Sequence, residues 1–191
     1  HFEDYADYIL KNFSELKNSL VIDIGSNDGT LLKFFKENGH RVIGIDPAKE
    51  ISSKANSQGI ETINDFFNYE CSNRIKEKYG KAGIITANNV FAHVDDLLDF
   101  VCGIKNLLSK DGIFVFEVSY LADVINDLLF DTIYHEHVSY HSVIPLVSFF
   151  ERNGMTLIEA NRIKSHGGSL RCIVKLREGK FRIRESVLEC I

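Results

Sequence analysis

The stretch that most constrains this chain is VIDIGSNDGTLL, residues 21–32. Its first four residues are mostly apolar, which is typical of a central parallel strand that is covered on both faces. Gly25 and Gly29 bracket a turn of small and polar residues, and glycine allows positive φ and a close approach of a ligand to the backbone. The next residues open a helix whose free N–H groups face that turn. The stretch therefore predicts a strand, a ligand-binding turn and a helix.

The spacing of the two glycines distinguishes two kinds of cofactor loop. A dinucleotide-binding loop has the pattern G-x-G-x-x-G, whereas here three residues separate Gly25 from Gly29 and Asp23 precedes them. Asp46 ends a second apolar run, where a carboxylate can accept hydrogen bonds from two ribose hydroxyls. Nucleotide-binding folds in general use an acid there, so the glycine loop has to decide between cofactors. An ordinary tight turn between strand and helix is the alternative interpretation.

The pattern D-x-G-x-x-x-G resembles motif I of class I S-adenosylmethionine-dependent methyltransferases. The resemblance implies S-adenosylmethionine as the cofactor and a Rossmann-like three-layer α/β sandwich. It also implies that the loop surrounds the methionine and ribose parts, and that the residues after the third strand lie beside the adenine. The implied cofactor-binding residues are Asp23, Gly25, Asn27, Gly29, Asp46, Asp65, Phe66, Asn88 and Asn89. Ser26 and Asp28 share the turn, and Asp28 is also suited to cap the following helix.

The alternation of apolar runs and amphipathic segments predicts an α/β fold. The predicted elements are a helix within 1–18, strands at 21–24, 42–45, 60–63, 83–87 and 113–118, helices at 30–38, 48–57, 74–79, 95–108 and 143–153, and a turn at 111–112. Two last strands, 156–161 and 169–176, are joined by a short loop and must pair antiparallel. The prediction is a mostly parallel seven-stranded sheet that ends in an antiparallel hairpin, the ending expected of a methyltransferase sheet.

Length, charge and cysteine spacing exclude several classes of partner. The 191 residues fit one domain, or one domain plus a fragment. A net charge of −5 without a basic run argues against a nucleic-acid binder. No apolar stretch approaches the roughly 20 residues of a membrane span, and no signal peptide begins the chain, so we expect a cytoplasmic protein without a membrane partner. The four cysteines lack the spacing of zinc ligands, and no metal is predicted.

Residues 131–141, DTIYHEHVSYH, concentrate groups that can move protons. Three histidines, two tyrosines and two acids fall within eleven residues, between the fifth strand and the next helix. That position lies beyond the carboxyl ends of the parallel strands, where α/β folds bind their ligands. Histidine is suited to proton transfer near neutral pH, and tyrosine can hydrogen-bond an oxygen that develops charge. The segment is therefore predicted to carry chemistry.

Two other interpretations of this segment are a metal site and a loop of solvated side chains. It does not match the metalloprotease pattern H-E-x-x-H, because position 139 is Ser139. A metal site formed by His135, His137 and His141 is conceivable, although alternation along the chain points two of them in different directions. Solvated histidines on a partly exposed loop would explain any single one of them. They do not explain the whole cluster, because packing alone seldom requires Tyr-His-Glu-His.

The sequence YHEH at 134–137, with NNVFAH at 88–93 and SHGGSLR at 165–171, looks like the C-methyltransferases that act on nucleotide-linked 4-keto-deoxysugars. The likeness covers roughly residues 1–177. It implies that a base removes the proton beside the ketone and that the enolate carbon then takes the methyl group. The implied catalytic residues are His137 as general base, Tyr134 and Glu136 to orient the sugar or steady the enolate and the imidazolium, and His93 to assist. His166 and the following two glycines either border the pocket or form a simple hairpin loop.

The same resemblance predicts the domain organisation. Residues 1–177 would be the methyltransferase domain, and 178–191 the start of a C-terminal extension that has nothing to pack against. Members of that family carry an N-terminal cysteine-rich zinc module and a further C-terminal domain that helps to hold the sugar nucleotide. Because these residues contain neither, we expect the chain to be part of a longer protein. Two other functions stay open: an O-methyltransferase in which His137 deprotonates a hydroxyl, and a non-catalytic cofactor-binding domain of a larger assembly.

Overall fold

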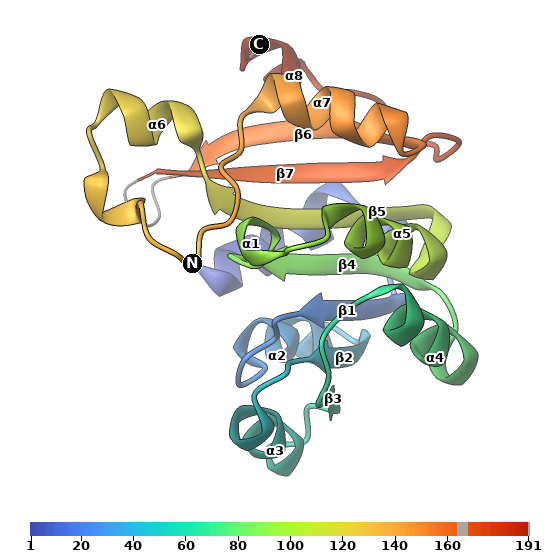
Figure 1. Ribbon diagram of the computed structural model, residues 1–191. Helices are drawn as coiled ribbons and strands as arrows, with labels where there is room; N and C mark the ends of the chain where they lie inside the picture. Colours follow the sequence, from blue (N-terminus) through green and yellow to red (C-terminus); the bar gives the residue numbers. More distant parts are fainter. Residues whose placement is uncertain (164–167, 191) are drawn as a thin grey trace.

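The computed structural model describes residues 1–163 and 168–190, which form one α/β body (Figure 1). The strands are β1 (Leu20–Ile24), β2 (Arg41–Ile45), β3 (Thr62–Ile63), β4 (Ala82–Asn88), β5 (Leu108–Ser119), β6 (Met155–Ile163) and β7 (Ser169–Leu176). The helices are α1 (Phe2–Asn12), α2 (Thr30–Glu37), α3 (Lys49–Ser57), α4 (Tyr69–Tyr79), α5 (Leu97–Leu107), α6 (Leu121–Asn126), α7 (Val143–Arg152) and α8 (Glu185–Glu189). Short 3-10 turns are η1 (Ser14–Leu16), η2 (Phe91–His93) and η3 (Phe130–Thr132).

Within the described residues, the seven strands form one sheet in the order β3-β2-β1-β4-β5-β7-β6. The strands from β3 to β5 all pair in parallel. β7 lies antiparallel between β5 and β6, so the predicted antiparallel hairpin at the end of the sheet is confirmed. The strand order reverses between β1 and β4, and α/β folds bind ligands at the carboxyl ends of the strands beside such a reversal.

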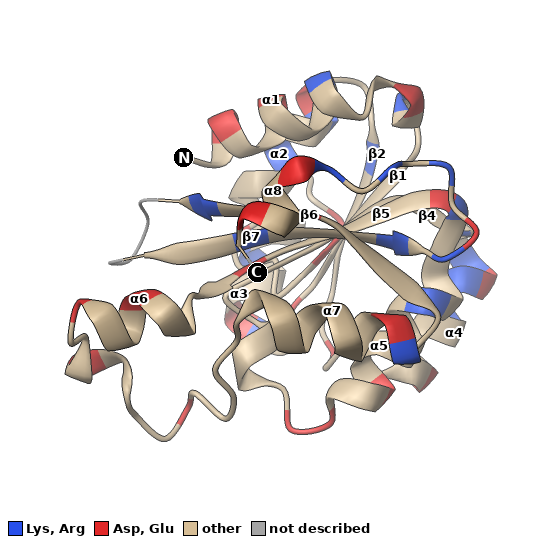
Figure 2. Cartoon of the chain, turned by 90° about the horizontal axis from the view of Figure 1, so that it is seen from above, with Lys and Arg blue, Asp and Glu red and all other residues tan. Residues whose placement is uncertain are grey.

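Helices cover both faces of the sheet, which confirms the predicted three-layer sandwich. One apolar cluster lies between the sheet and α1, α2 and α3, and a second lies between the sheet and α4, α5 and α7. Figure 2 shows the sheet from above, with α1 and α2 on one side and α5 and α7 on the other. Each face of the strands is therefore buried, which explains why β1 and β4 are almost continuously apolar.

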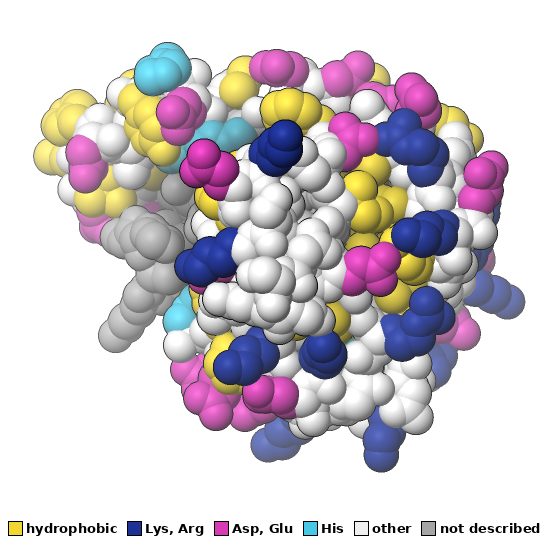
Figure 3. Space-filling view, turned by 90° about the horizontal axis from the view of Figure 1, so that it is seen from below, with side chains coloured by type: hydrophobic (Ala, Val, Ile, Leu, Met, Phe, Trp, Pro, Cys, Tyr) yellow, Lys and Arg dark blue, Asp and Glu magenta, His cyan; other side chains and the backbone are white. Residues whose placement is uncertain are grey.

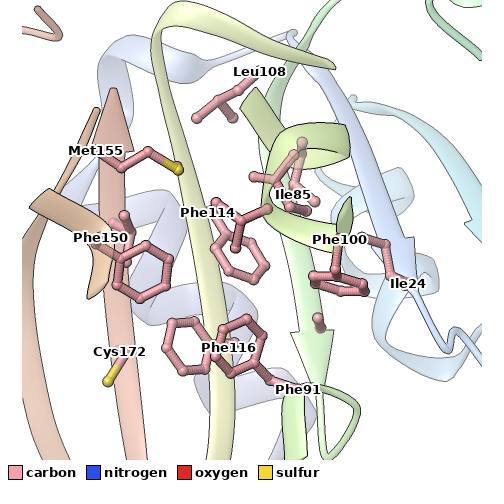
Figure 4. Packing of buried hydrophobic residues seen from close by; sticks show 14 of the residues in the cluster. Ile24, Ile85, Phe91, Phe100, Leu108, Phe114, Phe116, Phe150, Met155 and Cys172 are labelled. Atoms are coloured by element: carbon pink, nitrogen blue, oxygen red, sulfur yellow. The ribbon is translucent and has the colours of Figure 1, made fainter. Parts of the chain in front are cut away.

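An aromatic cluster fixes the residues that follow β4. The ring of Phe91, in η2, lies 4.7 Å from Phe116 and 6.0 Å from Phe150, and all three side chains are fully buried (Figure 4). Burying a phenylalanine side chain stabilises a fold by roughly 1.5–3 kcal/mol. η2 is thus held firmly against β5 and α7.

Several element boundaries differ from the predicted ones for local reasons. α4 begins at Tyr69 rather than at residue 74, because the Asn68 side chain accepts a hydrogen bond from the Cys71 N–H at 2.7 Å and caps the helix. The predicted turn at 111–112 lies inside β5. There Leu108 pairs with Ala82 and Ile113 with Ile84, so the intervening residues bulge out of the ladder.

Two further differences concern the ends of predicted strands and helices. β3 contains only two residues instead of the predicted 60–63, because Ile60 is buried beneath Gly29 and its N–H bonds to the carbonyl of Ala55 at the end of α3. The N-terminal helix packs on the sheet as expected, but it ends at Asn12 and is followed by η1.

Residues 178–190 pack against the sheet, so the expectation that they have nothing to pack against is wrong. The Arg184 N–H bonds to the carbonyl of Ile158 at 2.8 Å, and its guanidinium pairs with the buried Glu159 at 2.7 Å. Val187 of α8 is 4% exposed and belongs to the main apolar cluster. The domain boundary at residue 177 stays a prediction. Within the part of the chain that the structure describes, no helix has the length and apolar character to cross a membrane.

Candidate active site

A pocket of about 470 Å³ opens at the carboxyl ends of β1 and β4, where the strand order reverses. Five of the predicted cofactor-binding residues line it together: Asp23, Gly25, Asn27, Asn88 and Asn89. The remaining lining residues are Phe2, Ser26, Asp28, Thr30, Leu31 and Val90. The sequence positions that were expected to meet at this edge of the sheet are therefore next to one another.

The glycine loop has a left-handed backbone at alternate positions. Gly25, Asn27 and Gly29 have φ values of 69°, 50° and 80°. A Cβ atom at Gly25 would lie 2.5 Å from Val90 Cγ2, and one at Gly29 would lie 2.8 Å from Ile60 Cγ2. Both positions therefore require glycine for two reasons: a residue with a Cβ would be strained at these φ values, and its Cβ would clash with the neighbouring side chain.

Asp46, at the end of β2, holds the glycine loop in place. Its Oδ2 accepts a hydrogen bond from the Asn27 N–H at 2.9 Å, and its Oδ1 accepts one from the Ala48 N–H at 2.9 Å. The carboxylate is 8% exposed and does not line the pocket of about 470 Å³. The predicted ribose-binding role of Asp46 stays a prediction, and the contact that the structure shows is with the loop backbone.

Asp23, at the carboxyl end of β1, is a buried acid in the pocket wall. Its Oδ1 accepts a hydrogen bond from the Thr86 hydroxyl at 2.6 Å. Burial raises the pKa of Asp23 from 3.8 to about 7, the Thr86 hydrogen bond opposes this shift, and the negative charge of Asp46 adds to it. Asp23 therefore changes its charge near neutral pH.

Two residues of the pocket wall each carry a buried side-chain oxygen that has no hydrogen-bond partner among the described residues. They are the hydroxyl oxygen of Ser26 and Oδ1 of Asn88. Buried polar atoms are nearly always hydrogen-bonded in folded proteins, so each unpaired atom requires an explanation. Ser26 Oγ lies against Gly44 of β2, 2.4 Å from where a Cβ at Gly44 would be, and both oxygens are covered by protein, so neither of them faces the open pocket.

Besides Asp46, three of the predicted cofactor residues do not line this pocket. Gly29 lines a separate groove of about 760 Å³ between α2 and the residues that follow α3. Asp65 accepts a hydrogen bond from the Phe66 N–H and forms an ion pair with Arg74, while the Phe66 side chain is 73% exposed. The structure thus brings neither Asp65 nor Phe66 to the pocket wall. Their predicted place beside the adenine stays a prediction.

The histidine segment is held against η2, directly after the pocket residues of β4. The N–H groups of Val138 and Ser139 both donate to the carbonyl of Ala92, at 3.0 and 3.2 Å. In return, Nδ1 of His93 lies 2.6 Å from the carbonyl of Glu136. Because η2 begins two residues after Asn89, these hydrogen bonds place the segment in space beside one wall of the pocket.

His137 is hydrogen-bonded at both ring nitrogens. Nδ1 lies 2.7 Å from the carbonyl oxygen of Thr132, and Nε2 lies 3.2 Å from the Tyr134 hydroxyl. A carbonyl oxygen can only accept, so Nδ1 carries the proton and Nε2 of the neutral ring is left as an acceptor. The His93 ring is 4.9 Å away. The arrangement presents a basic nitrogen, and a tyrosine hydroxyl is in contact with it.

The other groups of the segment have different surroundings. The Glu136 side chain is 63% exposed and its carboxylate lies 4.0 Å from His135, whose own side chain is 90% exposed. His141 is buried, with its ring 5.1 Å from Phe91 and its Nε2 2.9 Å from the Ser139 hydroxyl. Burial lowers the pKa of His141 to about 4, so it stays neutral. Within the described residues no His, Cys, Asp and Glu side chains group as metal ligands, and the alternative metal site is not supported.

The downstream motif at 165–171 is only partly visible. Ser165, His166 and Gly167 lie outside the described residues, so their predicted place beside the pocket stays a prediction. Arg171 is described, and its guanidinium forms a buried ion pair with Glu117 at 2.6 Å, directly opposite on β5. The carbonyl of Glu117 also accepts a hydrogen bond from the Asn89 N–H at 2.9 Å. The ion pair therefore adjoins the pocket residues from the side of β7.

Among the residues that take part in these contacts, Phe2, Thr86 and Thr132 were not predicted. Thr86 could have been found from the strand pattern, because it precedes Asn88 by two residues and so faces the same side of β4. Phe2 reaches the pocket from the start of α1, and Thr132 acts through its backbone carbonyl. Neither of these roles leaves a signal in the sequence.

The segment around the histidines has a distinctive surface. Residues 121–151 contain no Lys or Arg, and Figure 2 shows acidic but no basic positions along α6. Figure 3 shows hydrophobic and acidic side chains, with histidine among them, on the part of the molecule that projects beside the sheet. The side chains of Ile125, Leu128, Phe130 and Ile133 are each more than 60% exposed.

Comparisons with known proteins agree with this architecture. The family model of the methyltransferase domain matches residues 1–160. The chain is 33% identical, over its whole length, to C-methyltransferase NovU of Streptomyces niveus, of which it spans 46%. It resembles the solved structure of an S-adenosylmethionine-dependent methyltransferase of Anabaena variabilis with a TM-score of 0.68 and 16% identity, over 90% of this chain and 83% of that one. It also resembles magnesium protoporphyrin IX methyltransferase of Synechocystis with bound S-adenosylhomocysteine, with a TM-score of 0.66 and 13% identity, over 90% of this chain and 82% of that one. The chain therefore belongs to the methyltransferase domain family, as its sequence predicts, and has the fold of the S-adenosylmethionine-dependent enzymes.

Proposed function

We propose that this chain is the methyl-transferring domain of an S-adenosylmethionine-dependent C-methyltransferase whose acceptor is a nucleotide-linked 4-keto-deoxysugar. His137 is the general base that removes the proton from the carbon beside the ketone. The observation that carries this proposal is the tautomer of His137. Because its Nδ1–H donates to the Thr132 carbonyl, Nε2 is unprotonated and accepts a hydrogen bond from the Tyr134 hydroxyl, so its lone pair is the one that can take a proton from a substrate. The segment that carries His137 is attached next to the pocket.

The residues of the pocket fit S-adenosylmethionine. Asn27, Asn88 and Asn89 line the pocket with side chains that can donate and accept hydrogen bonds, and the chain comes close at Gly25, where Val90 fills the space that a side chain would need. Asp23 provides a buried acid, which suits a ligand that carries positive charge. The cofactor supplies an electrophilic methyl group on its sulfonium sulfur. The chain's own task is to hold the acceptor carbon in line with that methyl group and to remove its proton.

A base of this kind is needed because the acceptor is carbon. The proton beside a ketone is acidic only to the extent that the resulting carbanion is an enolate, so a positioned base accelerates its removal. After proton transfer the His137 ring is an imidazolium, which the Thr132 carbonyl stabilises at Nδ1. Once Nε2 has taken the proton it no longer accepts from the Tyr134 hydroxyl 3.2 Å away, so this hydroxyl is released to donate to the enolate oxygen.

Sequence similarity to known enzymes also supports methyl transfer to carbon. NovU is named a C-methyltransferase, and its similarity to this chain extends over all 191 residues, including the histidine segment. The YHEH and NNVFAH sequences resemble the sugar enzymes in the same way. His93 and Glu136 take part through the hydrogen bond that joins η2 to the segment, and we place them as supports of His137.

Two measurements test the proposal. Calorimetric titration of the chain should show binding of S-adenosylhomocysteine and no binding of NADH. In the full-length protein, a nucleotide-linked 4-keto-deoxysugar in deuterated water should exchange the hydrogen beside its ketone, and the His137→Gln variant should not exchange it. Binding of NADH alone would overturn the cofactor assignment. Methyl transfer to oxygen without carbon-bound exchange would identify an O-methyltransferase instead.

A further inference from the structure

The carbonyl oxygen of Thr132 accepts two hydrogen bonds. One comes from Nδ1 of His137 at 2.7 Å, and the other comes from the Tyr140 hydroxyl at 3.1 Å. The Tyr140 ring also stands edge-on to the His137 imidazole, with ring centroids 5.9 Å apart and an interplanar angle of 88°. Tyr140 thus reaches His137 both through a shared acceptor and through direct ring contact.

The shared carbonyl decides which nitrogen of His137 is basic. In a neutral imidazole one nitrogen carries the proton and the other accepts, and the hydrogen bond at one nitrogen sets the state of the other. If the Thr132 carbonyl turned away, the proton would no longer be held on Nδ1, and the form with a protonated Nε2 would become populated. That form has no lone pair on Nε2 with which to take a proton from a substrate.

The position of Thr132 makes a second restraint on its carbonyl necessary. It is the last residue of η3, a single turn beside the exposed side chains of Phe130 and Ile133. Tyr140, in contrast, lies between Ser139, whose N–H bonds to the carbonyl of Ala92, and the buried His141. Tyr140 therefore connects the well-anchored end of the segment with its exposed end.

We propose that Tyr140 is a positioning residue for His137: its hydroxyl holds the Thr132 carbonyl in line with Nδ1, so that Nε2 is kept unprotonated and ready to act as the base. The proposal deepens the function proposed above and rests on it only where Nε2 acts on a substrate. The state of the His137 ring itself can be measured without any substrate.

The test is Tyr140→Phe, which keeps the ring and removes only the hydroxyl. ¹⁵N NMR of histidine-labelled protein should show His137 protonated at Nδ1 in the natural protein and a mixture of both tautomers in the variant. In the full-length enzyme we expect kcat to fall about fivefold, the value of one hydrogen bond of about 1 kcal/mol, with KM and the affinity for S-adenosylhomocysteine unchanged. Tyr69→Phe, on the exposed start of α4, is the matched control and should change none of these quantities.

The outcomes separate this proposal from the proposed function. An unchanged His137 tautomer in Tyr140→Phe, with an unchanged kcat, would refute the role of Tyr140 while leaving His137 as the base. A shifted tautomer in a protein that exchanges no carbon-bound hydrogen would confirm the positioning and refute the sugar C-methyltransferase. If the variant does not fold, the natural protein alone still decides, because a His137 ring protonated at Nε2 contradicts the proposal.

Discussion

The cofactor pocket and the histidine segment lie side by side but are built by different means. The pocket walls are the ends of β1 and β4, both buried in the sheet, and its loop conformation follows from glycines at 25 and 29. The segment 121–142 contains one helix of six residues, α6, one 3-10 turn, η3, and several exposed apolar side chains. The first region is shaped by the fold, whereas the second is shaped by a few hydrogen bonds to backbone carbonyls.

Because the two regions are built differently, we expect substitutions in them to affect different properties of the protein. A change in the pocket has to distort packed strands, so it should affect folding and cofactor binding together. In the segment the carbonyls of Ala92, Thr132 and Glu136 accept the hydrogen bonds that fix it, and few buried contacts support them. Regions of low local stability can change without affecting the rest of the fold. A change there should affect catalysis and leave cofactor binding intact.

The largest expected effect comes from the base itself. His137→Gln keeps a polar side chain of similar length but removes the basic nitrogen. We expect kcat of the full-length enzyme to fall by roughly 10²–10⁴-fold, the range typical of general base catalysis. The affinity for S-adenosylhomocysteine, measured by calorimetry, should stay within twofold, because His137 does not line the cofactor pocket.

His135 provides the matched control for that prediction. It lies two residues earlier, and its side chain is 90% exposed. His135→Gln should leave kcat within about twofold of the natural value, as for most exposed substitutions. Equal losses in the two variants would show that the segment as a whole, and not His137 Nε2, carries the activity.

The next effect concerns the pocket. In Gly25→Ala the new Cβ would lie 2.5 Å from Val90 Cγ2, at a residue whose φ is 69°. Left-handed backbone costs a residue with a Cβ about 1–2 kcal/mol, and overpacking adds about 1–3 kcal/mol. We expect lower stability to urea and affinity for S-adenosylhomocysteine reduced by about tenfold, because each 1.4 kcal/mol is tenfold in binding.

Gly80→Ala is the control that distinguishes the cost of a left-handed backbone from the cost of close packing. Its φ is 87°, but a Cβ there would meet no atom within 4 Å. Gly80→Ala should therefore show only the conformational cost, with binding of S-adenosylhomocysteine unchanged. If both variants bound the ligand equally well, the contact between Gly25 and Val90 would not shape the pocket.

The same division explains how much could be predicted from the sequence. Strands, crossovers and the glycine loop follow from local patterns, so β1, α2 and the turn between them are predicted within one residue of their observed bounds. The packing of 178–190 on β6 was not predictable, because it depends on Glu159 and Ile158 being available on a strand that lies far away in the sequence.

The candidate site shows the same limit at the level of single residues. Asn88 lies at the end of β4 and lines the pocket, because residues that directly follow an apolar run lie at the end of a strand, and its contact with the cofactor stays a prediction. Phe66 was assigned by analogy with a family and is exposed away from the pocket. The hydrogen bond from His137 to the Thr132 carbonyl depends on a chain reversal between them, and no side-chain pattern indicates which backbone atom will be reached.

A smaller effect is expected from pH acting on Asp23. Its pKa is raised to about 7, so the folded state favours the neutral acid. This contribution is fully present below about pH 4 and is lost as the pH rises through about 7. Urea unfolding at pH 5 and pH 8 should therefore show the natural protein losing about 2 kcal/mol relative to Asp23→Asn. Parallel changes in the two proteins would contradict the assignment of this titration to Asp23.

The smallest effect, and the sharpest contrast, should come from His141. Burial lowers its pKa to about 4, so its contribution to stability is present above pH 6.5 and is lost as the pH falls through about 4. Acid therefore acts on the segment in the opposite direction from its action on Asp23. Between pH 6.5 and 5.5 the amides of Val138 and Ser139, which bond to Ala92, should lose about 1 kcal/mol of protection from hydrogen exchange.

The control for that prediction lies in the pocket. The Asn89 N–H bonds to the carbonyl of Glu117 and should keep its protection over the same pH range, while in His141→Gln the amides at 138 and 139 should no longer respond to pH. If the Asn89 amide lost protection together with those of the segment, the two regions would open as one cooperative unit. The two regions would then have the same local stability although they are built differently, and substitutions in the segment would also weaken cofactor binding.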